Sequence, residues 1–431
     1  MTDADDDAGE SYRLMIVAGE TSGDAHAASL VRALRERAPA ARFEFFGGTQ
    51  GQTRAEGVES IVRTDELSIT GLVEIARALP RFRRAYRELK REGLRRRPDA
   101  VVLVDWPDFN LRLARHFRRR GLRVVYYVSP QLWAWRGHRV RQVRRDIDLL
   151  LAILPFEPEW YAARGVSHVE FVGHPLTGEV ARQDNRAEFC RRHGLDPARP
   201  LVALLPGSRR KELLRILPPM LRAARLVANA VAGAQFVVAL APARSDAEAE
   251  SLIAAEGETS ISRAEGESLI SAAANSGDGA NSAGAADALN VRVVRGETRE
   301  LLSAADAAAV ASGTATLEAA LTETPLVVVY RESALNWNLL GRLITVEHYG
   351  LVNLIAGRRV APELMQHDFT PPALARELLR LLDPAENERA RAALRDATAR
   401  LGTERASLRA ADAVLRHLRQ WRVASGASDR G

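Results

Sequence analysis

The chain has 431 residues, 46% of them hydrophobic, and a formal net charge of +6. This length and composition exclude a disordered protein and lead us to expect two domains of roughly 200 residues. The one cysteine, Cys190, excludes a disulfide framework and a cysteine-cluster metal site. Uninterrupted apolar runs are far shorter than the roughly 20 residues that a membrane-spanning helix needs, and residues 1–10 are too acidic for a secretory signal.

Short apolar runs alternate along the chain with longer segments of helical period. Predicted strands occupy residues 14–18, 43–46, 100–104, 124–128, 149–154 and 169–172 of the first half, and 201–205, 236–240, 291–294, 307–311 and 326–330 of the second. Several runs are apolar at successive positions, which is typical of parallel strands buried on both faces. We therefore predict an α/β fold with two Rossmann-like, doubly wound domains that face a cleft.

Changes in composition suggest where the domains begin and end. We expect a disordered acidic N-terminus at 1–10, a first Rossmann-like domain at 11–180, a second at 181–370, helices at 371–421 that could pack back on the first domain, and a frayed tail at 422–431. Residues 244–289 are rich in Ala, Ser, Gly and Glu, and within them AEGETSIS recurs as AEGESLIS. We interpret this segment as an inserted surface loop, disordered or loosely helical.

Polar residues gather where predicted strands end, and open α/β sheets bind their ligands there. The first strand runs into GETSGD, in which Gly19 and Gly23 permit close approach of a ligand to the backbone. A helix that begins here would favour an anion or a polar sugar group, with Glu20, Ser22 and Asp24 beside it. The alternative is an ordinary turn in which Ser22 or Asp24 only caps the helix.

Two further strand ends belong to the first half of the chain. Asp105 follows four apolar residues in VDWPDFN, where it could accept a proton from a substrate hydroxyl. Alternatively, Asp105 or Asp108 caps the next helix. The stretch SPQLWAWR suits a sugar or lipid face with an anionic group, through Trp133, Trp135 and Arg136. The alternative there is a pair of core aromatics with an arginine whose head reaches solvent.

In the second half of the chain, two predicted strands are also followed by turns with polar residues. Ser208 and Arg209 of LPGSR begin a helix, where the arginine fork could hold a phosphate. The small residues of SGTATLE could let backbone N–H groups meet a diphosphate: Ser312, Gly313 and Thr314. Glu318 could take two ribose hydroxyls, and Asn353 is the best polar ligand downstream. The alternatives are ordinary caps with solvated arginines and a glutamate that only favours the helix dipole.

Several motifs of cofactor chemistry are absent from the sequence. There is no G-x-G-x-x-G and no Walker A motif, which argues against dinucleotide and P-loop chemistry. Asp146 and Asp148 have the spacing of a carboxylate metal clamp, but they lie at the start of a predicted strand rather than at its end. We therefore predict no metal site and no cofactor.

Eight stretches, taken in order, resemble the lipid-A-disaccharide synthase family, inverting glycosyltransferases (glycosyltransferase family 19) of the two-domain GT-B fold. They are GETSGD at 19–24, VDWPDFN at 104–110, YVSPQLWAWR at 127–136, LPFE at 154–157, FVGHP at 171–175, LPGSR at 205–209, SGTATLE at 312–318 and NLIAGR at 353–358. Each stretch alone is a weak signal, whereas all eight in order are highly specific. Two features depart from the family pattern: the segment 244–289, and Val352 where a proline usually precedes the asparagine.

The resemblance implies an inverting, metal-independent hexosyltransferase of lipid A synthesis. Such an enzyme transfers 2,3-diacylglucosamine from UDP-2,3-diacylglucosamine to 2,3-diacylglucosamine 1-phosphate, and it releases UDP and a β-1,6-linked disaccharide 1-phosphate. The family's catalytic aspartate falls on Asp105 and its phosphate-binding arginine on Arg209. The resemblance also implies a cytoplasmic protein in peripheral contact with the inner membrane.

An apolar segment beside a basic cluster is the candidate for that membrane contact. The expected membrane-facing residues are Leu72, Val73, Ile75, Leu79, Phe82, Arg83 and Arg84. Their apolar side chains could dip into a bilayer while the arginines attract anionic lipids. The alternative is an amphipathic core helix with a solvated basic face.

Two competing functions are compatible with parts of the pattern. Another UDP-sugar enzyme, such as an N-acetylglucosaminyltransferase or a 2-epimerase, would share the fold, but its water-soluble substrate would not need the apolar surface. A basic α/β protein that binds nucleic acid would gather aromatics and arginines on one exposed strip. Here the polar residues follow strand ends instead, so we expect no nucleic-acid partner. The sequence makes no prediction of the oligomeric state.

Overall fold

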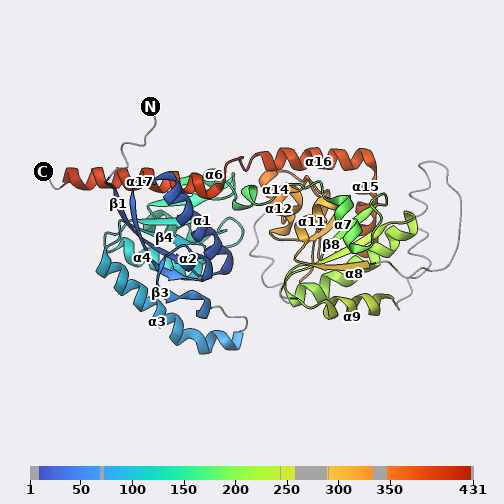
Figure 1. Ribbon diagram of the computed structural model, residues 1–431, viewed down its shortest axis with the longest axis horizontal. Helices are drawn as coiled ribbons and strands as arrows, with labels where there is room; N and C mark the ends of the chain where they lie inside the picture. Colours follow the sequence, from blue (N-terminus) through green and yellow to red (C-terminus); the bar gives the residue numbers. More distant parts are fainter. Residues whose placement is uncertain are drawn as a thin grey trace. The chain divides into compact units, whose positions relative to one another are not determined.

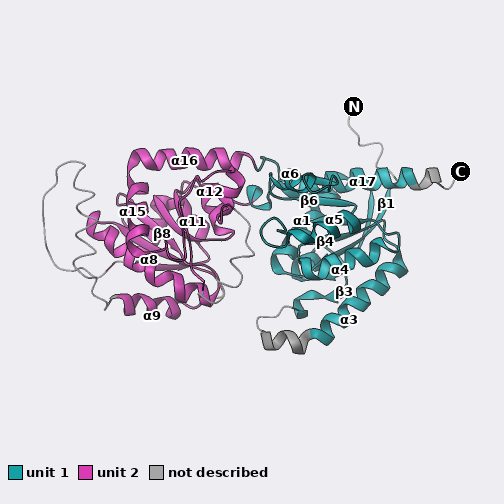
Figure 2. Cartoon of the chain, turned by 180° about the vertical axis from the view of Figure 1, so that it is seen from behind, with its two compact units in different colours: residues 1–178, 401–431 teal, residues 179–400 magenta. Residues whose placement is uncertain are grey.

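The computed structural model of the chain describes residues 9–67, 72–242, 244–257, 289, 291–332 and 347–428, without the side chains of 72–78, 257 and 425–428. The chain divides into two compact units, Met1–Gly178 with Leu401–Gly431 and Glu179–Arg400 (Figure 2). Each unit is built on a parallel sheet with helices between successive strands. The predicted α/β class with two doubly wound sheets is therefore confirmed.

Within the described residues, the first unit contains a seven-stranded sheet in the order β3-β2-β1-β4-β5-β6-β7. Its strands are β1 (Ser11–Ala18), β2 (Arg42–Thr49), β3 (Glu59–Arg63), β4 (Ala100–Val104), β5 (Val124–Tyr127), β6 (Leu149–Ala152) and β7 (Val169–Phe171). Its helices are α1 (Thr21–Arg37), α2 (Gly51–Ala55), α3 (Leu72–Arg96), α4 (Pro107–Arg118), α5 (Val140–Asp146), α6 (Glu157–Ala162) and α17 (Ala406–Ser428), with 3-10 turns η2 (Thr64–Leu67), η3 (Gly137–Arg139) and η4 (Pro175–Gly178).

In the described part of the second unit, the sheet has six strands in the order β10-β9-β8-β11-β12-β13. The strands are β8 (Leu201–Leu205), β9 (Gln235–Leu240), β10 (Val291–Arg295), β11 (Ala307–Ala311), β12 (Leu326–Tyr330) and β13 (Glu363–Met365). The helices are α7 (Arg186–His193), α8 (Arg210–Ala230), α9 (Asp246–Gly257), α11 (Thr298–Ala304), α12 (Ala315–Leu321), α14 (Leu351–Ala356), α15 (Pro371–Leu382) and α16 (Pro384–Ala399).

Every strand predicted from an apolar run is present, and β3 and β13 are two further strands that no apolar run predicted. Both missed strands lie at the edge of a sheet and are short, with residues that are mostly only partly buried. The strand predicted at 149–154 ends earlier, at Ala152, because the backbone N–H groups of Ile153 and Leu154 donate to the Glu157 carboxylate instead of continuing the strand.

The first unit buries both faces of its sheet under different helices. Leu14 and Ile16 of β1 pack in the core beneath α1 and α17, which contact each other (Figure 1). Met15 and Val17, which alternate with them, pack in a second core with residues of α3, α4, α5 and α6. Because successive side chains of a strand point to opposite faces, a strand covered on both faces is apolar at every position.

Helix α9 corrects part of the insertion predicted at 244–289. Ala249 is fully buried, and Leu252 and Ile253 pack against the core of the second unit beside α8 (Figure 1). Residues 246–257 are therefore a packed helix rather than a surface loop. The predicted insertion at 258–288 lies outside the described residues.

Beyond α16, the chain contributes α17 to the first unit. Arg409 of α17 donates to the Phe171 carbonyl at the end of β7 (2.9 Å), and Arg405 pairs with Glu36 of α1 (2.8 Å). None of the helices in the described ranges is both long enough and apolar enough to cross a membrane.

Candidate active site

A strained turn follows β4. Asp105 (φ 51°) and Trp106 (φ 52°) both adopt the left-handed backbone conformation. This conformation costs about 1–2 kcal/mol for each residue that carries a Cβ. Two such residues in succession persist only where the surrounding structure holds them, and strain of this kind concentrates at functional sites.

Two buried side chains hold the turn in place. The Asp105 carbonyl accepts hydrogen bonds from Asn110 Nδ2 (2.8 Å) and from the Tyr126 hydroxyl (2.6 Å). Asn110 Nδ2 also donates to the Val104 carbonyl (3.1 Å), and both side chains are fully buried. These contacts aim the Asp105 side chain by fixing its backbone.

The GETSGD stretch forms one structure with this turn. A Cβ at Gly19 would lie 2.0 Å from the Trp106 ring, so only glycine lets the ring pack there. A Cβ at Gly23 would lie 3.6 Å from the Asp105 Cβ. The GETSGD and VDWPDFN motifs are therefore brought together, as their positions after the neighbouring parallel strands β1 and β4 require.

The Asp105 carboxyl has the proton affinity that a general base needs. Burial, together with the negative charge of Glu20, raises the pKa of Asp105 to about 6. The residue is only partly buried, so its carboxyl can meet a ligand. A base with a pKa near the working pH is ionised and still takes up a proton effectively.

Asp108 has a different environment from Asp105. Although burial opposes the change, ion pairs with Arg139 (2.7 Å) and Arg136 (2.8 Å) lower the pKa of Asp108. The N-cap position of α4 is occupied by Trp106, which makes no side-chain capping hydrogen bond, so neither Asp105 nor Asp108 is the N-cap residue of this helix. The alternative that one of them caps this helix is therefore wrong.

Among the residues of GETSGD, the prediction that Asp24 binds the substrate is wrong. Its side chain is 2% exposed and accepts hydrogen bonds from the backbone N–H groups of Gln50 (3.0 Å) and Gln52 (2.8 Å). The carboxylate therefore holds the start of α2, and a direct contact with substrate is excluded by its burial. Glu20 and Ser22 are exposed beside Asp105 and stay available.

The SPQLWAWR loop contributes one exposed tryptophan and one buried one. Trp135 is 48% exposed, and the Arg136 guanidinium lies 3.9 Å from the centre of its ring. Trp133 is 7% exposed and donates from Nε1 to Glu157 (3.2 Å). The prediction that Trp133 faces the acceptor is therefore wrong, while Trp135 and Arg136 can still reach a ligand.

Glu157, within LPFE, is a buried acidic residue to which no role was assigned from the sequence. Its fully buried carboxylate accepts from the backbone N–H groups of Ile153 (3.1 Å) and Leu154 (3.0 Å) as well as from Trp133. Burial raises the pKa of Glu157 to about 7. This side chain joins the end of β6 to the SPQLWAWR loop. The sequence signal that could have indicated this role is a glutamate just after an apolar strand.

In the second unit, the turn between β8 and α8 surrounds a carboxylate. Glu212 Oε2 accepts from the backbone N–H groups of Ser208 (3.0 Å) and Arg209 (3.1 Å), and Oε1 accepts from Arg209 Nη1 (2.8 Å). The Arg209 side chain is otherwise 80% exposed. Gly207 (φ 104°) is required here, because a Cβ would lie 2.5 Å from Glu212 Oε2.

The SGTATLE turn after β11 is open to solvent. Gly313 and Thr314 are exposed, and nothing lies within 4 Å of the position that a Gly313 Cβ would take. Ser312 Oγ donates to the Tyr349 carbonyl (2.9 Å), and Glu318 accepts from Arg299 Nε (3.0 Å). The turn therefore offers the exposed Gly313 and Thr314 to a ligand, while the Ser312 hydroxyl and the Glu318 carboxylate already have partners within the unit.

Asn353 is fully buried, and its side chain has no free polar atom. Oδ1 accepts from the N–H groups of Val360 (2.8 Å) and Ala361 (2.9 Å). Nδ2 donates to the Ala361 carbonyl (2.8 Å) and to Glu363 Oε1 (2.8 Å). These contacts contradict the prediction that the Asn353 side chain binds UDP directly; it holds the loop before β13 instead.

The predicted membrane segment is described only in part. The side chains of Leu72, Val73 and Ile75 lie outside the described residues. Leu79 is 46% exposed, and Arg83 and Arg84 are exposed. Phe82 is partly buried and packs against the core, with its ring centre 6.0 Å from that of Trp106, so only part of its side chain is left for a membrane contact.

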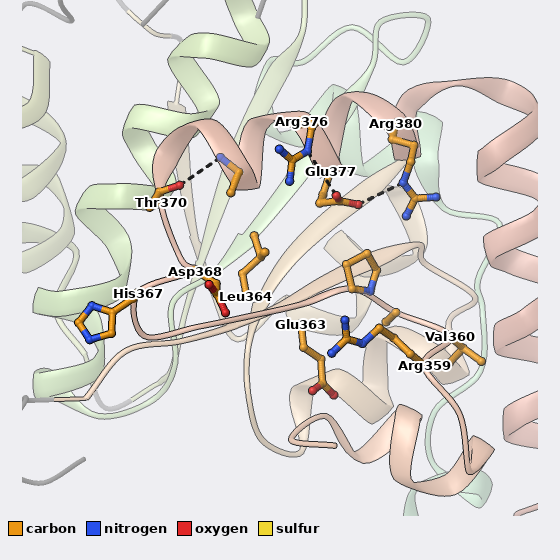
Figure 3. Close-up of a pocket in the computed structure, with 13 residues that line it drawn as sticks. Arg359, Val360, Glu363, Leu364, His367, Asp368, Thr370, Arg376, Glu377 and Arg380 are labelled. Atoms are coloured by element: carbon orange, nitrogen blue, oxygen red, sulfur yellow. Dashed lines mark hydrogen bonds and ion pairs between the residues drawn. The ribbon is translucent and has the colours of Figure 1, made fainter. Parts of the chain in front are cut away.

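A cavity of about 810 Å³ lies in the second unit beside β13 and α15 (Figure 3). Charged side chains line it, among them Arg359, Arg376 and Arg380, with Glu363 and Glu377. It contains none of the predicted site residues. Across the described ranges, no three His, Cys, Asp or Glu side chains are grouped so that they could hold a metal ion.

The chain matches known proteins over nearly its whole length. The model of a family described as lipid-A-disaccharide synthetase matches residues 14–276 and 280–416. A lipid-A-disaccharide synthase from Myxococcus xanthus is 40% identical over 412 residues, which cover 95% of this chain and 99% of that protein. One from Anaeromyxobacter dehalogenans is 41% identical over 404 residues, which cover 94% and 97%.

Solved structures support the fold. A UDP-GlcNAc 2-epimerase from Neisseria meningitidis bound to UDP-GlcNAc has a TM-score of 0.54 and 10% identity, covering 95% of this chain and 100% of that one. MurG from Acinetobacter baumannii has a TM-score of 0.52 and 14% identity, covering 94% and 99%. At these identities the likeness concerns the architecture alone.

Proposed function

The chain belongs to the lipid-A-disaccharide synthase family and is a UDP-sugar glycosyltransferase, and from this premise we propose its reaction and the residues that carry it. It transfers 2,3-diacylglucosamine from UDP-2,3-diacylglucosamine to the 6-hydroxyl of 2,3-diacylglucosamine 1-phosphate, with inversion. The observation that carries the proposal is the strained turn that presents Asp105, a carboxyl with a pKa of about 6.

Asp105 acts as the general base of this reaction. As the acceptor oxygen bonds to the anomeric carbon, its proton passes to Asp105 and the bond from that carbon to UDP breaks. General-base assistance is typically worth about 10²–10⁴ in rate. Glu20, Ser22, Trp135 and Arg136 surround the acceptor, since they belong to the exposed part of the same strand ends.

The second unit holds the UDP part of the donor. The leaving diphosphate gains negative charge, which the Arg209 fork and the N–H groups of Ser208 and Arg209 can stabilise. The open SGTATLE turn offers Ser312, Gly313 and Thr314 to the nucleotide, and Glu318 the ribose contact. Asn353 supports this unit as a buried structural residue.

The reaction itself is the direct test. The purified chain is incubated with UDP-2,3-diacylglucosamine and 2,3-diacylglucosamine 1-phosphate, and the products are analysed by mass spectrometry. We expect the disaccharide 1-phosphate and an equal amount of UDP. A 2-epimerase would instead change the donor without consuming the acceptor, and this outcome would overturn the proposal.

The pH dependence of the rate should report Asp105. Because a general base must be ionised, we expect kcat/KM to be level above about pH 6 and to fall about tenfold per unit below it. The measurement is a profile of kcat/KM between pH 5 and 8.5 at subsaturating acceptor. A profile that stays flat down to pH 5 would contradict a base with this raised pKa.

Unpaired arginines on one face of the first unit support peripheral membrane contact. Arg91, Arg95 and Arg145 of α3 and α5 pair with carboxylates. Other exposed arginines of α3 to α6 and their ends have no carboxylate within 4.0 Å among the described residues: Arg81, Arg83, Arg84, Arg87, Arg112, Arg115, Arg119, Arg120, Arg141, Arg144 and Arg164. On the opposite face, Arg416 and Arg422 of α17, and Arg405 just before it, each pair with a carboxylate of the unit. The free positive charge therefore lies on the side that carries Leu79.

Vesicle binding tests this contact. Each arginine near an anionic surface contributes about 1 kcal/mol, so Arg83→Gln/Arg84→Gln/Arg87→Gln should weaken binding to vesicles with anionic phosphatidylglycerol at least about tenfold. The control removes as much charge elsewhere, from exposed arginines without an ion pair in the described residues: Arg42→Gln/Arg191→Gln/Arg292→Gln. Equal losses in both variants, or equal binding of the unaltered chain to neutral vesicles, would contradict the proposal.

A further inference from the structure

The turn that the proposed function assigns to the donor diphosphate already contains an anion. The Glu212 carboxylate accepts from the N–H groups of Ser208 (3.0 Å) and Arg209 (3.1 Å) and from the Arg209 guanidinium (2.8 Å). The Glu212 side chain is 14% exposed, whereas that of Arg209 is 80% exposed. The carboxylate therefore lies inside the turn, and the arginine covers it from the solvent side.

Two neighbouring arginines of α8 are paired with other carboxylates. Arg210 pairs with Glu248 (3.2 Å), and Arg215 pairs with Glu332. Glu212 is thus the side chain that supplies negative charge to the Ser208–Arg209 turn in the described structure. Gly207 makes this possible, because any Cβ at that position would meet Glu212 Oε2.

A carboxylate and a phosphate require the same donors. Both are held by backbone N–H groups at the start of a helix and by the planar fork of an arginine. Two anions cannot share the same N–H pair and guanidinium at hydrogen-bond distance without strong repulsion. A diphosphate that binds to Arg209 and to the start of α8 must therefore replace Glu212.

We propose that Glu212 is an internal substitute for the donor diphosphate. In the free enzyme it keeps the Ser208–Arg209 turn and the Arg209 guanidinium in place, and it gives up these donors when the nucleotide binds. The inference rests on the proposed function, because it takes the Arg209 turn as the diphosphate site. Glu212 is a positioning residue in this account: it does not touch the reacting atoms, and it lowers the affinity for the diphosphate by competing with it.

The test compares UDP with uridine, which lacks the diphosphate. Glu212→Gln keeps a carbonyl that can accept from the two N–H groups but removes the charge that holds Arg209. We expect UDP to bind about fivefold to tenfold more tightly to this variant, and uridine to bind as it does to the unaltered chain, both by calorimetric titration. The free variant should also unfold at a lower temperature.

Glu248→Gln is the matched control. It removes one negative charge beside the same helix, from the partner of Arg210, without a contact to the Ser208–Arg209 turn. Its ratio of UDP to uridine affinity should stay within about twofold of the unaltered ratio. An equal gain in both variants would show a general charge effect and overturn the proposal.

Two other outcomes are decisive. If Glu212→Gln binds UDP no more tightly than the unaltered chain, Glu212 is only a helix cap and the inference is wrong. If the unaltered chain binds uridine and UDP equally, the diphosphate site of the proposed function fails instead. Should Glu212→Gln not fold, Glu212→Asp shortens the reach of the carboxylate and should raise the affinity for UDP relative to uridine.

Discussion

Asp105→Asn should lower kcat by about 10²–10⁴-fold and leave the Kd for UDP unchanged. The amide cannot take the proton of the acceptor hydroxyl, so the chemical step loses its base. Asparagine has nearly the same shape and tolerates the left-handed conformation that Asp105 adopts (φ 51°). The turn and its hydrogen bonds from Asn110 and Tyr126 should therefore survive. Steady-state kinetics with saturating donor and calorimetric titration of UDP provide the measurement.

The same variant should be at least as stable as the unaltered chain. An unfolded aspartate has a pKa near 3.9, whereas burial raises the pKa of Asp105 to about 6. The folded state thus binds the proton more tightly, and above about pH 6 the ionised carboxyl is a full cost to folding. Removing the charge should raise Tm at pH 8 or leave it unchanged. A fall in both Tm and kcat would point to misfolding, and near-normal kinetics would refute the role of Asp105.

Asp65→Asn is a suitable control for this experiment. Asp65 is a surface carboxylate of the same unit, 41% exposed and paired with Arg54 (2.7 Å). Its replacement removes the same charge without touching the Asp105 turn, so we expect kinetics close to those of the unaltered chain.

Arg209→Ala should have the second-largest effect, through the donor rather than the acceptor. Loss of a charged donor aimed at the leaving group typically lowers kcat about 10²–10³-fold, and here the affinity for UDP should fall as well. Because the Arg209 side chain is 80% exposed and contacts Glu212, the variant should fold normally. Arg209→Lys keeps the charge but not the two-pronged geometry, so it should recover only part of the activity.

The neighbouring Arg210 provides a control that distinguishes a specific role of Arg209 from a general loss of positive charge. Arg210 is 68% exposed and pairs with Glu248, so Arg210→Ala removes a positive charge one residue away. We expect this variant to keep most of the activity and of the UDP affinity. Equal losses in Arg209→Ala and Arg210→Ala would show that the turn does not recognise the diphosphate through Arg209.

Most of the fold was predictable because burial on both faces leaves a simple trace in the sequence. Strands such as β4 and β11 are apolar at every position, since helices cover both faces of each sheet. The edge strands β3 and β13 have no such trace, because their residues are mostly half-exposed and include charged side chains. The prediction of a surface loop at helix α9 was wrong because the alanine-rich sequence of this helix resembles a loose loop, although Ala249 is fully buried.

The sequence by itself determined which residue types follow each strand. Because parallel sheets bind ligands at the carboxyl ends of their strands, this order places Asp105, Arg209 and the SGTATLE turn at ligand-binding edges. Only the tertiary structure decided which of these polar groups are free. Trp133 forms a hydrogen bond with Glu157, Asn353 with Glu363, and Asp24 with the start of α2. In each pair the two residues are far enough apart in the chain that no local sequence pattern predicts the contact. The physical reason is that a buried polar atom must find a partner, and the fold chooses that partner.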